Sequence, residues 1–193
     1  MPMKRAAACV AVLISCTATL SAQDRTPRTL TLREAVDLAL RATCDPGDEV
    51  ILHEPSYVAY VPAVVFAGGS VVHVATRLED DFALDPAAVE AAITPRTKAL
   101  FLGYPCNPTG AVLPDDVQDE LARIAERHDL LVYSDEIYDR LAYGTYRHRA
   151  FSALPGMRDR TILMGGFSKA YAMTGWRVGY LAAPVAILEG IVK

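Results

Sequence analysis

Short apolar runs alternate with longer segments of helical spacing from about residue 45 onward. Runs of strand length predict β-strands over residues 49–52, 70–75, 99–102, 130–134, 161–165 and 177–182. Apolar residues at helical spacing predict helices over residues 57–67, 86–92 and 114–128, and a last one from Pro184. A repeated strand-then-helix order predicts an α/β fold, with a mostly parallel sheet and helices on both of its faces.

The first 22 residues have a different pattern. Lys4 and Arg5 precede an apolar run, and small and polar residues then follow as far as Ala22. This order is typical of a secretory signal peptide over residues 1–22, and the apolar run is too short to span a bilayer. Cys16 also fits the lipidated cysteine of a lipoprotein signal, and a buried amphipathic helix is the structural alternative.

Residues 23–44 form a second distinct segment. Thr31 can cap a helix, Glu34 completes a capping box, and the residues that follow present one apolar helical face. The stretch 30–40 resembles the first helix of mature outer-membrane efflux channel proteins. We therefore expect this short helical segment to be foreign to residues 45–193, with a junction near Cys44.

Composition narrows the classes of protein that fit. The chain has 193 residues, 52% of them hydrophobic, and a formal net charge of −4. This length supports one domain of ordinary size, and the slight acidity argues against nucleic-acid binding, which favours a basic face. The four cysteines lack the spacing of a metal site or a disulfide framework, so we predict no metal. The histidines are scattered and are interpreted as structural or surface residues: His53, His73, His128 and His148.

The strongest chemical pattern surrounds Lys169, which lies on a turn of small residues after the apolar run 161–165, with Arg177 shortly downstream. A partly desolvated lysine amine can be neutral near pH 7 and form a Schiff base, and an arginine can neutralise a phosphate. Pyridoxal phosphate chemistry requires both groups. The structural alternative is a surface lysine and a surface arginine beside a glycine-rich turn.

A second pattern follows the predicted strand at 99–102. Pro105 and Pro108 flank Asn107 and restrict the backbone around it, which holds the amide in one direction. An amide can donate to a phenolic oxygen or to a carboxylate. An ordinary Asn-Pro turn is the structural alternative.

Two more strands end in candidate residues. Asp135 and Glu136 follow the strand at 130–134, which places a carboxylate at the edge where open α/β sheets bind ligands. A helix N-cap at Ser134 or Asp135 is the alternative. Tyr57 follows the strand at 49–52, and its alternative is packing on a helix face.

In this order, the segments 54–60, 104–110, 134–138 and 164–180 resemble the motifs of class I aminotransferases, which are fold-type-I pyridoxal phosphate enzymes. The likeness is closest to the aspartate/aromatic branch and covers about residues 45–193. It implies a partial large domain, because the sequence shows neither the family's upstream glycine-rich phosphate-binding turn nor its C-terminal domain. It also implies pyridoxal 5′-phosphate as cofactor, transamination between an amino acid and a 2-oxo acid, and a homodimer.

The resemblance implies a role for each matching residue. Lys169 would be the catalytic lysine that carries the cofactor and moves a proton, and Asp135 would pair with the pyridine nitrogen. Tyr138 and Asn107 would hydrogen-bond the phenolic oxygen. Tyr57 would stack on the ring, and Arg177 would bind the phosphate. One position departs from many relatives, because Gly166 stands where they have a serine that contacts the phosphate.

Two alternatives of different kinds stay open at this point. The chain is either an incomplete aminotransferase or a non-catalytic exported fusion fragment, and carbon–sulfur lyases with the same motifs are a third possibility. The aminotransferase resemblance favours a cytoplasmic location, whereas the first 22 residues favour export to the periplasm or envelope. The amino donor is not predicted, because the substrate-side residues of the family lie mainly in the parts without a counterpart here.

Overall fold

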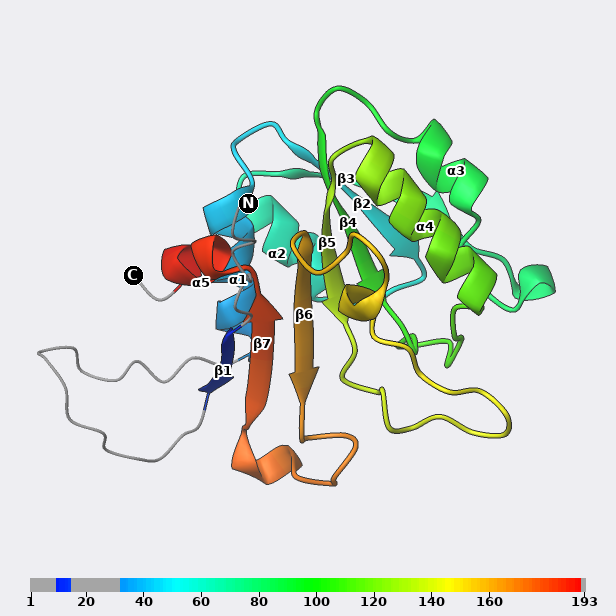
Figure 1. Ribbon diagram of the computed structural model, residues 1–193, viewed down its shortest axis with the longest axis vertical. Helices are drawn as coiled ribbons and strands as arrows, with labels where there is room; N and C mark the ends of the chain where they lie inside the picture. Colours follow the sequence, from blue (N-terminus) through cyan, green and yellow to red (C-terminus); the bar gives the residue numbers. More distant parts are fainter. Residues whose placement is uncertain (1–9, 15–31, 192–193) are drawn as a thin grey trace, which may run out of the picture.

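The computed structural model describes residues 10–14 and 32–191 of the chain (Figure 1). The strands are β1 (Val10–Ile14), β2 (Glu49–Glu54), β3 (Ser70–Ala75), β4 (Thr97–Gly103), β5 (Leu131–Asp135), β6 (Thr161–Gly166) and β7 (Gly179–Ala183). The helices are α1 (Leu32–Thr43), α2 (Tyr60–Phe66), α3 (Pro86–Ala91), α4 (Asp115–Arg127) and α5 (Val185–Ile191), with short 3-10 turns η1 (Leu78–Asp80), η2 (Phe151–Ala153) and η3 (Thr174–Trp176). None of the described helices is long and apolar enough to cross a membrane.

All described strands belong to one sheet in the order β1-β7-β6-β5-β4-β2-β3. Strands β2 to β6 run parallel, β7 pairs antiparallel with β6, and β1 pairs antiparallel with β7 at the edge. The parallel strands therefore bring their carboxyl ends to one edge, where Gly103 lies beside Asp135 and Asp135 beside Met164. This architecture confirms the predicted α/β fold with a mostly parallel sheet.

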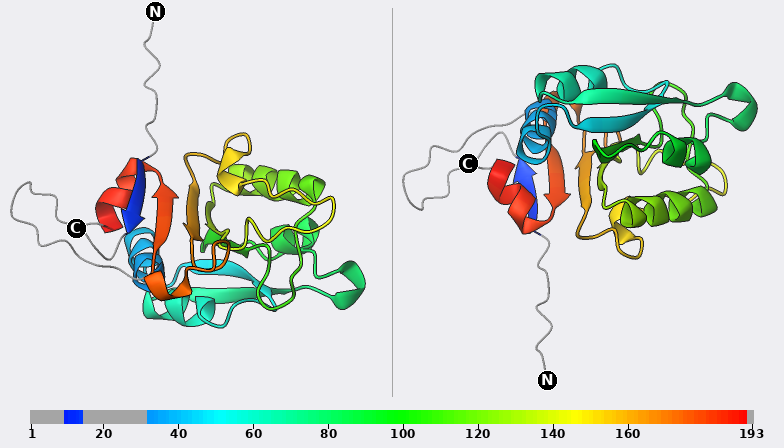
Figure 2. Two further views of the ribbon diagram at one scale, coloured as in Figure 1. Left: turned by 90° about the horizontal axis from the view of Figure 1, so that it is seen from below. Right: turned by 90° about the horizontal axis from the view of Figure 1, so that it is seen from above.

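Helices cover both faces of the sheet (Figures 1 and 2). Helices α1, α2 and α5 lie on one face, and α3 and α4 lie on the other. Successive residues of a strand point to opposite faces, so in β2 Val50 and Leu52 pack in the α1/α2 cluster, whereas Ile51 packs in the α4 cluster. Because the central strands are buried on both faces, they are apolar along most of their length, which explains why their runs stand out in the sequence.

Several predicted boundaries differ from the structure, and two of these differences affect the site most. The helix predicted over 57–67 begins at Tyr60, because a turn closed by the Tyr60 N–H and the Tyr57 carbonyl oxygen (3.1 Å) precedes it. The strand predicted over 177–182 begins at Gly179, because Arg177 has a left-handed φ of 53°, which an extended strand does not allow. Tyr57 and Arg177 consequently lie in loops at the edge of the sheet.

The N-terminal predictions are tested only in part. Within the predicted signal peptide over 1–22, the described residues 10–14 form strand β1, and the remainder lies outside the described residues, as does the predicted cap Thr31. Helix α1, from the segment 23–44, buries Val36, Ala39 and Leu40 in the same cluster as α2 and the sheet. The segment thus contributes to the core, while its foreign origin and a cleavage after Ala22 stay predictions.

Candidate functional site

The candidate site lies at the carboxyl edge of the parallel strands, where the loops after β2, β4, β5 and β6 meet. Asp135 is the last residue of β5 and is only partly buried. Its Oδ1 accepts a hydrogen bond from the Ile137 N–H (3.1 Å), and its Oδ2 accepts one from the Tyr60 hydroxyl (2.8 Å). The predicted helix N-cap alternative is not observed, because residues 137–140 form turns rather than a helix.

The electrostatic setting of Asp135 is unusual for a carboxylate. Burial raises the pKa of Asp135 above its ordinary value and the neighbouring Glu136 raises it further, while the hydrogen bonds from Tyr60 and Ile137 lower it. Within residues 32–191, no cationic side chain forms an ion pair with Asp135. A carboxylate in this position suits a cationic N–H from a bound group, because a charge-assisted hydrogen bond in a partly dry site is strong.

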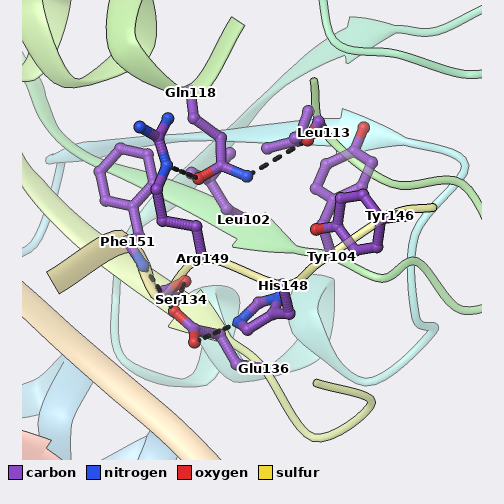
Figure 3. Close-up of a pocket in the computed structure, with 10 residues that line it drawn as sticks. All are labelled: Leu102, Tyr104, Leu113, Gln118, Ser134, Glu136, Tyr146, His148, Arg149 and Phe151. Atoms are coloured by element: carbon purple, nitrogen blue, oxygen red, sulfur yellow. Dashed lines mark hydrogen bonds and ion pairs between the residues drawn. The ribbon is translucent and has the colours of Figure 1, made fainter. Parts of the chain in front are cut away.

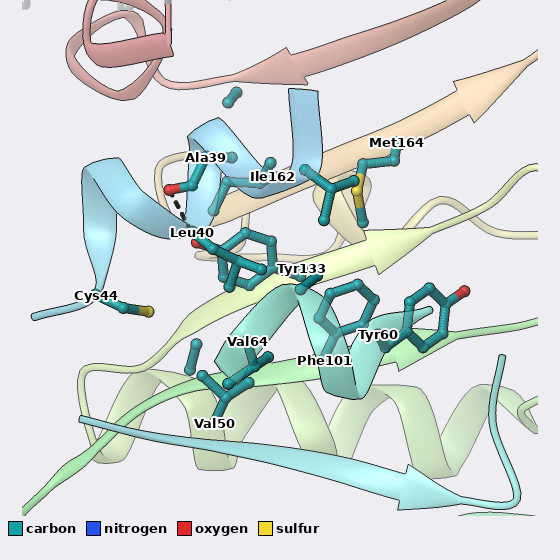
Figure 4. Packing of buried hydrophobic residues seen from close by; sticks show 14 of the residues in the cluster. Ala39, Leu40, Cys44, Val50, Tyr60, Val64, Phe101, Tyr133, Ile162 and Met164 are labelled. Carbon is teal, nitrogen blue, oxygen red and sulfur yellow. Dashed lines mark hydrogen bonds between the residues drawn. The ribbon is translucent and has the colours of Figure 1, made fainter. Parts of the chain in front are cut away.

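Tyr60 is the site residue that sequence reasoning missed. It is the first residue of α2, its exposed fraction is 8%, and its ring packs on Phe101 with ring centroids 4.2 Å apart. Figure 4 shows Tyr60 at the end of the buried cluster toward which the parallel strands point. The available signal was the three-residue spacing of Tyr57 and Tyr60, which in the predicted helix over 57–67 would place both aromatic rings on one side.

Tyr57 lies beside this buried pair. Its exposed fraction is 42%, and its ring meets Tyr60 edge-on, with centroids 5.5 Å apart and planes at 79°. Tyr57 is therefore near Asp135 and keeps a surface that can cover a flat ligand.

Lys169 and Arg177 lie on the loop that joins β6 to β7. Lys169 is exposed, and its Nζ lies 5.9 Å from the centre of the Tyr138 ring, which belongs to the loop after β5. Arg177 is exposed and donates to the Thr174 carbonyl oxygen (3.1 Å) of its own loop. Its guanidinium forms no ion pair among the described residues, so its charge remains available to an anion.

The position of Gly165, near the end of β6, favours glycine for a steric reason. A Cβ atom at Gly165 would lie 2.3 Å from the Tyr180 ring, so this position of β6 cannot carry a side chain unless Tyr180 moves. Gly166, where a serine was expected from the resemblance, has only ordinary contacts and a backbone that a side chain can adopt. The structure therefore does not require glycine at 166.

Asn107 lies in a closed turn after β4. The Gly110 N–H donates to the Cys106 carbonyl oxygen (2.8 Å), and the Cys106 N–H donates to the Ala111 carbonyl oxygen (2.8 Å). Asn107 is partly buried at the end of this turn, and the peptide bonds before Pro105 and Pro108 are cis. The turn holds Asn107 at the same edge of the sheet as Asp135.

His53 connects the loop after β2 with the end of β4. Its Nε2 accepts from the Gly103 N–H (3.1 Å), so its Nδ1 carries the proton and donates to the Pro55 carbonyl oxygen (3.1 Å). Burial lowers the pKa of His53 to about 4, with a smaller opposing effect from the Pro55 bond. The neutral ring is a structural link, which agrees with the interpretation of the histidines as structural residues.

A second polar cluster lies on the α4 side of the sheet. Glu136 is buried and accepts hydrogen bonds from the Ser134 hydroxyl (2.9 Å), the Phe151 N–H (2.9 Å) and His148 Nε2 (2.6 Å). Figure 3 shows these side chains in a small pocket between α4 and the end of the sheet, also lined by Gln118 on α4. This cluster ties the loop after β5 to the sheet and is separate from the group around Asp135.

Comparison with known proteins adds to this geometry. A family model described as "Aminotransferase class I and II" matches residues 29–193. The chain belongs to this family.

Among the relatives of this chain, an aspartate aminotransferase from Pyrococcus abyssi is 44% identical over 160 residues, which are 83% of the chain and 41% of the relative. An aspartate/prephenate aminotransferase from Thermus thermophilus is 45% identical over 82% of the chain and 40% of its own length. The structure of an aromatic aminotransferase from Pyrococcus horikoshii superposes with a TM-score of 0.82 and 44% identity, over 84% of the chain and 44% of that structure. The expected aspartate/aromatic branch is therefore confirmed, and the chain spans about two fifths of the length of these relatives.

The family match begins before α1, at residue 29, and does not include residues 1–28. No comparison supports the signal peptide predicted for residues 1–22. The match includes most of the segment 23–44 without deciding its origin.

Proposed function

We propose that this chain forms part of a pyridoxal phosphate-dependent aminotransferase that transfers an amino group between an amino acid and a 2-oxo acid. The observation that carries the proposal is the Asp135 carboxylate, partly buried and without a cationic partner among the described side chains, at the same sheet edge as Lys169. The family match and the aminotransferase names of the relatives support it.

The residues present fit the cofactor that the resemblance implies. Asp135 would hold a protonated pyridine nitrogen, and pyridoxal phosphate would then supply an electron-poor ring that accepts an electron pair. Lys169 would provide the amine that binds the cofactor's aldehyde carbon and moves a proton to or from the substrate's α carbon.

The other predicted residues would orient the ring. Tyr138, whose ring lies beside the Lys169 amine, and Asn107 would donate to the phenolic oxygen. Tyr57 would cover one face of the ring, and Arg177 would neutralise the phosphate. Because the chain spans about two fifths of its relatives, the substrates and a homodimeric assembly are part of this proposal.

Lys169 provides the direct test. We expect the full chain with pyridoxal phosphate to develop a visible absorbance band, and borohydride followed by peptide mapping to find the label on Lys169. Lys98 is the matched control, because it is an exposed lysine near the amino end of β4, at the opposite edge of the sheet. The band should disappear in Lys169→Ala and persist in Lys98→Ala. Equal labelling of both lysines, or no band, would favour the non-catalytic fragment.

A further inference from the structure

The hydroxyl of Tyr60 reaches Asp135 from a ring that packing holds in place. Tyr60 and Asp135 are 75 residues apart in the chain, yet the hydroxyl lies 2.8 Å from Oδ2. Phe101 packs on the Tyr60 ring and Tyr57 meets it edge-on, so the ring has little freedom to turn away. The packing of the core beneath the site therefore holds the Tyr60 hydroxyl in hydrogen-bond distance of Asp135.

A glycine on the neighbouring strand keeps room for this contact. Gly103 is the register partner of Asp135, and a Cβ atom there would lie 2.8 Å from the Tyr60 hydroxyl oxygen. The Gly103 N–H is held by His53, so β4 cannot easily shift to accept a side chain. The end of β4 is thus shaped to let a phenol lie beside the carboxylate.

The two donors to Asp135 act on different oxygens. The Ile137 N–H binds Oδ1 and the Tyr60 hydroxyl binds Oδ2, so together they define the plane of the carboxylate. Each carboxylate oxygen can accept more than one hydrogen bond, so a further donor can still bind. We propose that Tyr60 is a positioning residue that holds Asp135 ready to receive the cationic ring nitrogen of the cofactor.

The choice of a neutral donor has a physical consequence. A lysine or arginine in the place of Tyr60 would cancel the charge of Asp135, whereas a phenol orients the carboxylate and leaves its charge available. Burial and the Asp135 carboxylate both raise the pKa of Tyr60, so the hydroxyl keeps its proton and remains a donor. This inference rests on the proposed function, because it takes the cationic partner of Asp135 to be the ring nitrogen of the cofactor that the proposed function requires.

The first test uses the full chain without cofactor. The pKa of Asp135 would be followed by NMR of ¹³C-labelled aspartate carboxyl groups in the parent protein, Tyr60→Phe and Tyr133→Phe. We expect Tyr60→Phe to raise it and Tyr133→Phe to leave it unchanged. Tyr133 is the matched control, since it also packs on Phe101 but its buried hydroxyl donates to the Ala39 carbonyl oxygen (3.2 Å). An unchanged Asp135 pKa in folded Tyr60→Phe would overturn the proposal, whether or not the chain binds pyridoxal phosphate.

The second test measures cofactor affinity by titration with pyridoxal phosphate. We expect Tyr60→Phe to weaken binding about tenfold, and to have little further effect in an Asp135→Asn background, because the hydroxyl acts through Asp135. Equal losses in both backgrounds would contradict the proposal. Gly103→Ala provides a separate route if Tyr60→Phe folds poorly, since it retains the hydroxyl but displaces it, and we expect it to raise the Asp135 pKa as well. Failure of the parent chain to bind would count against the proposed function alone.

Discussion

Asp135 and Glu136 are adjacent acids in the sequence, but they have opposite surroundings in the structure. Asp135 faces the α2 side of the sheet, accepts from one hydroxyl and one N–H, and stays partly exposed. Glu136 faces the α4 side, accepts three hydrogen bonds and is closed off from solvent. The difference shows that the Asp135 carboxylate can still accept a hydrogen bond from a ligand, whereas the Glu136 carboxylate is fully engaged in binding the loop after β5.

Among these predictions, removal of the Glu136 carboxylate has the largest expected effect on stability. Glu136→Ala would leave the Ser134 hydroxyl, the Phe151 N–H and His148 Nε2 without their acceptor. We expect the free energy of unfolding to fall by about 4 kcal/mol, because each buried unpaired group costs about 1–3 kcal/mol. Urea unfolding measures the change. A loss below about 1 kcal/mol would show that the loop after β5 does not depend on Glu136.

The pH dependence of stability tests the His53–Gly103 hydrogen bond, which joins β2 to β4 beside Asp135. The pKa of His53 is about 4 in the folded chain and 6.5 ordinarily, so between these values the unfolded chain binds more protons. Stability should therefore fall as the pH is lowered through this window, by about 3 kcal/mol in total. Urea unfolding from pH 7 to 4 measures this loss, which His53→Gln should lack. His73→Gln is the control for the loss of a histidine, because the His73 side chain is 43% exposed and lies outside the link between β2 and β4.

Removal of the Asp135 charge has a smaller expected effect, which appears in cofactor binding rather than in stability. We expect Asp135→Asn to weaken pyridoxal phosphate binding about a hundredfold, which corresponds to about 2.7 kcal/mol, because the ring nitrogen loses its charged partner. The free energy of unfolding should change by less than about 1 kcal/mol, since no cation is left unpaired, and the amide oxygen can still accept from the Ile137 N–H while the amide NH2 donates to the Tyr60 hydroxyl oxygen. Cofactor titration and urea unfolding on the same samples separate the two effects. Lost stability with unchanged binding would reverse the comparison with Glu136.

The sequence by itself determined the layer architecture and the position of the chemistry along the chain. Strands buried on both faces are apolar along most of their length, so their runs stand out, and the edge at which parallel strands end follows from their common direction. Asp135 could therefore be placed at that edge from the sequence, as could the loop that carries Lys169. The starts of α2 at Tyr60 and of β7 at Gly179 were misjudged, because turns and left-handed residues leave weak local signals. Strand β1 was not predicted either, because its apolar run was assigned to a signal peptide.

Only the tertiary structure decided which residues meet at that edge. The Tyr60–Asp135 hydrogen bond and the His53–Gly103 hydrogen bond join residues 75 and 50 positions apart. Such contacts depend on strand register and on how α2 packs over the sheet, and neither leaves a local pattern in the sequence. The opposite surroundings of Asp135 and Glu136 likewise follow from the side of the sheet that each one faces. The sequence shows only two neighbouring acids, and the packing of different helices on the two faces of the sheet makes their surroundings differ.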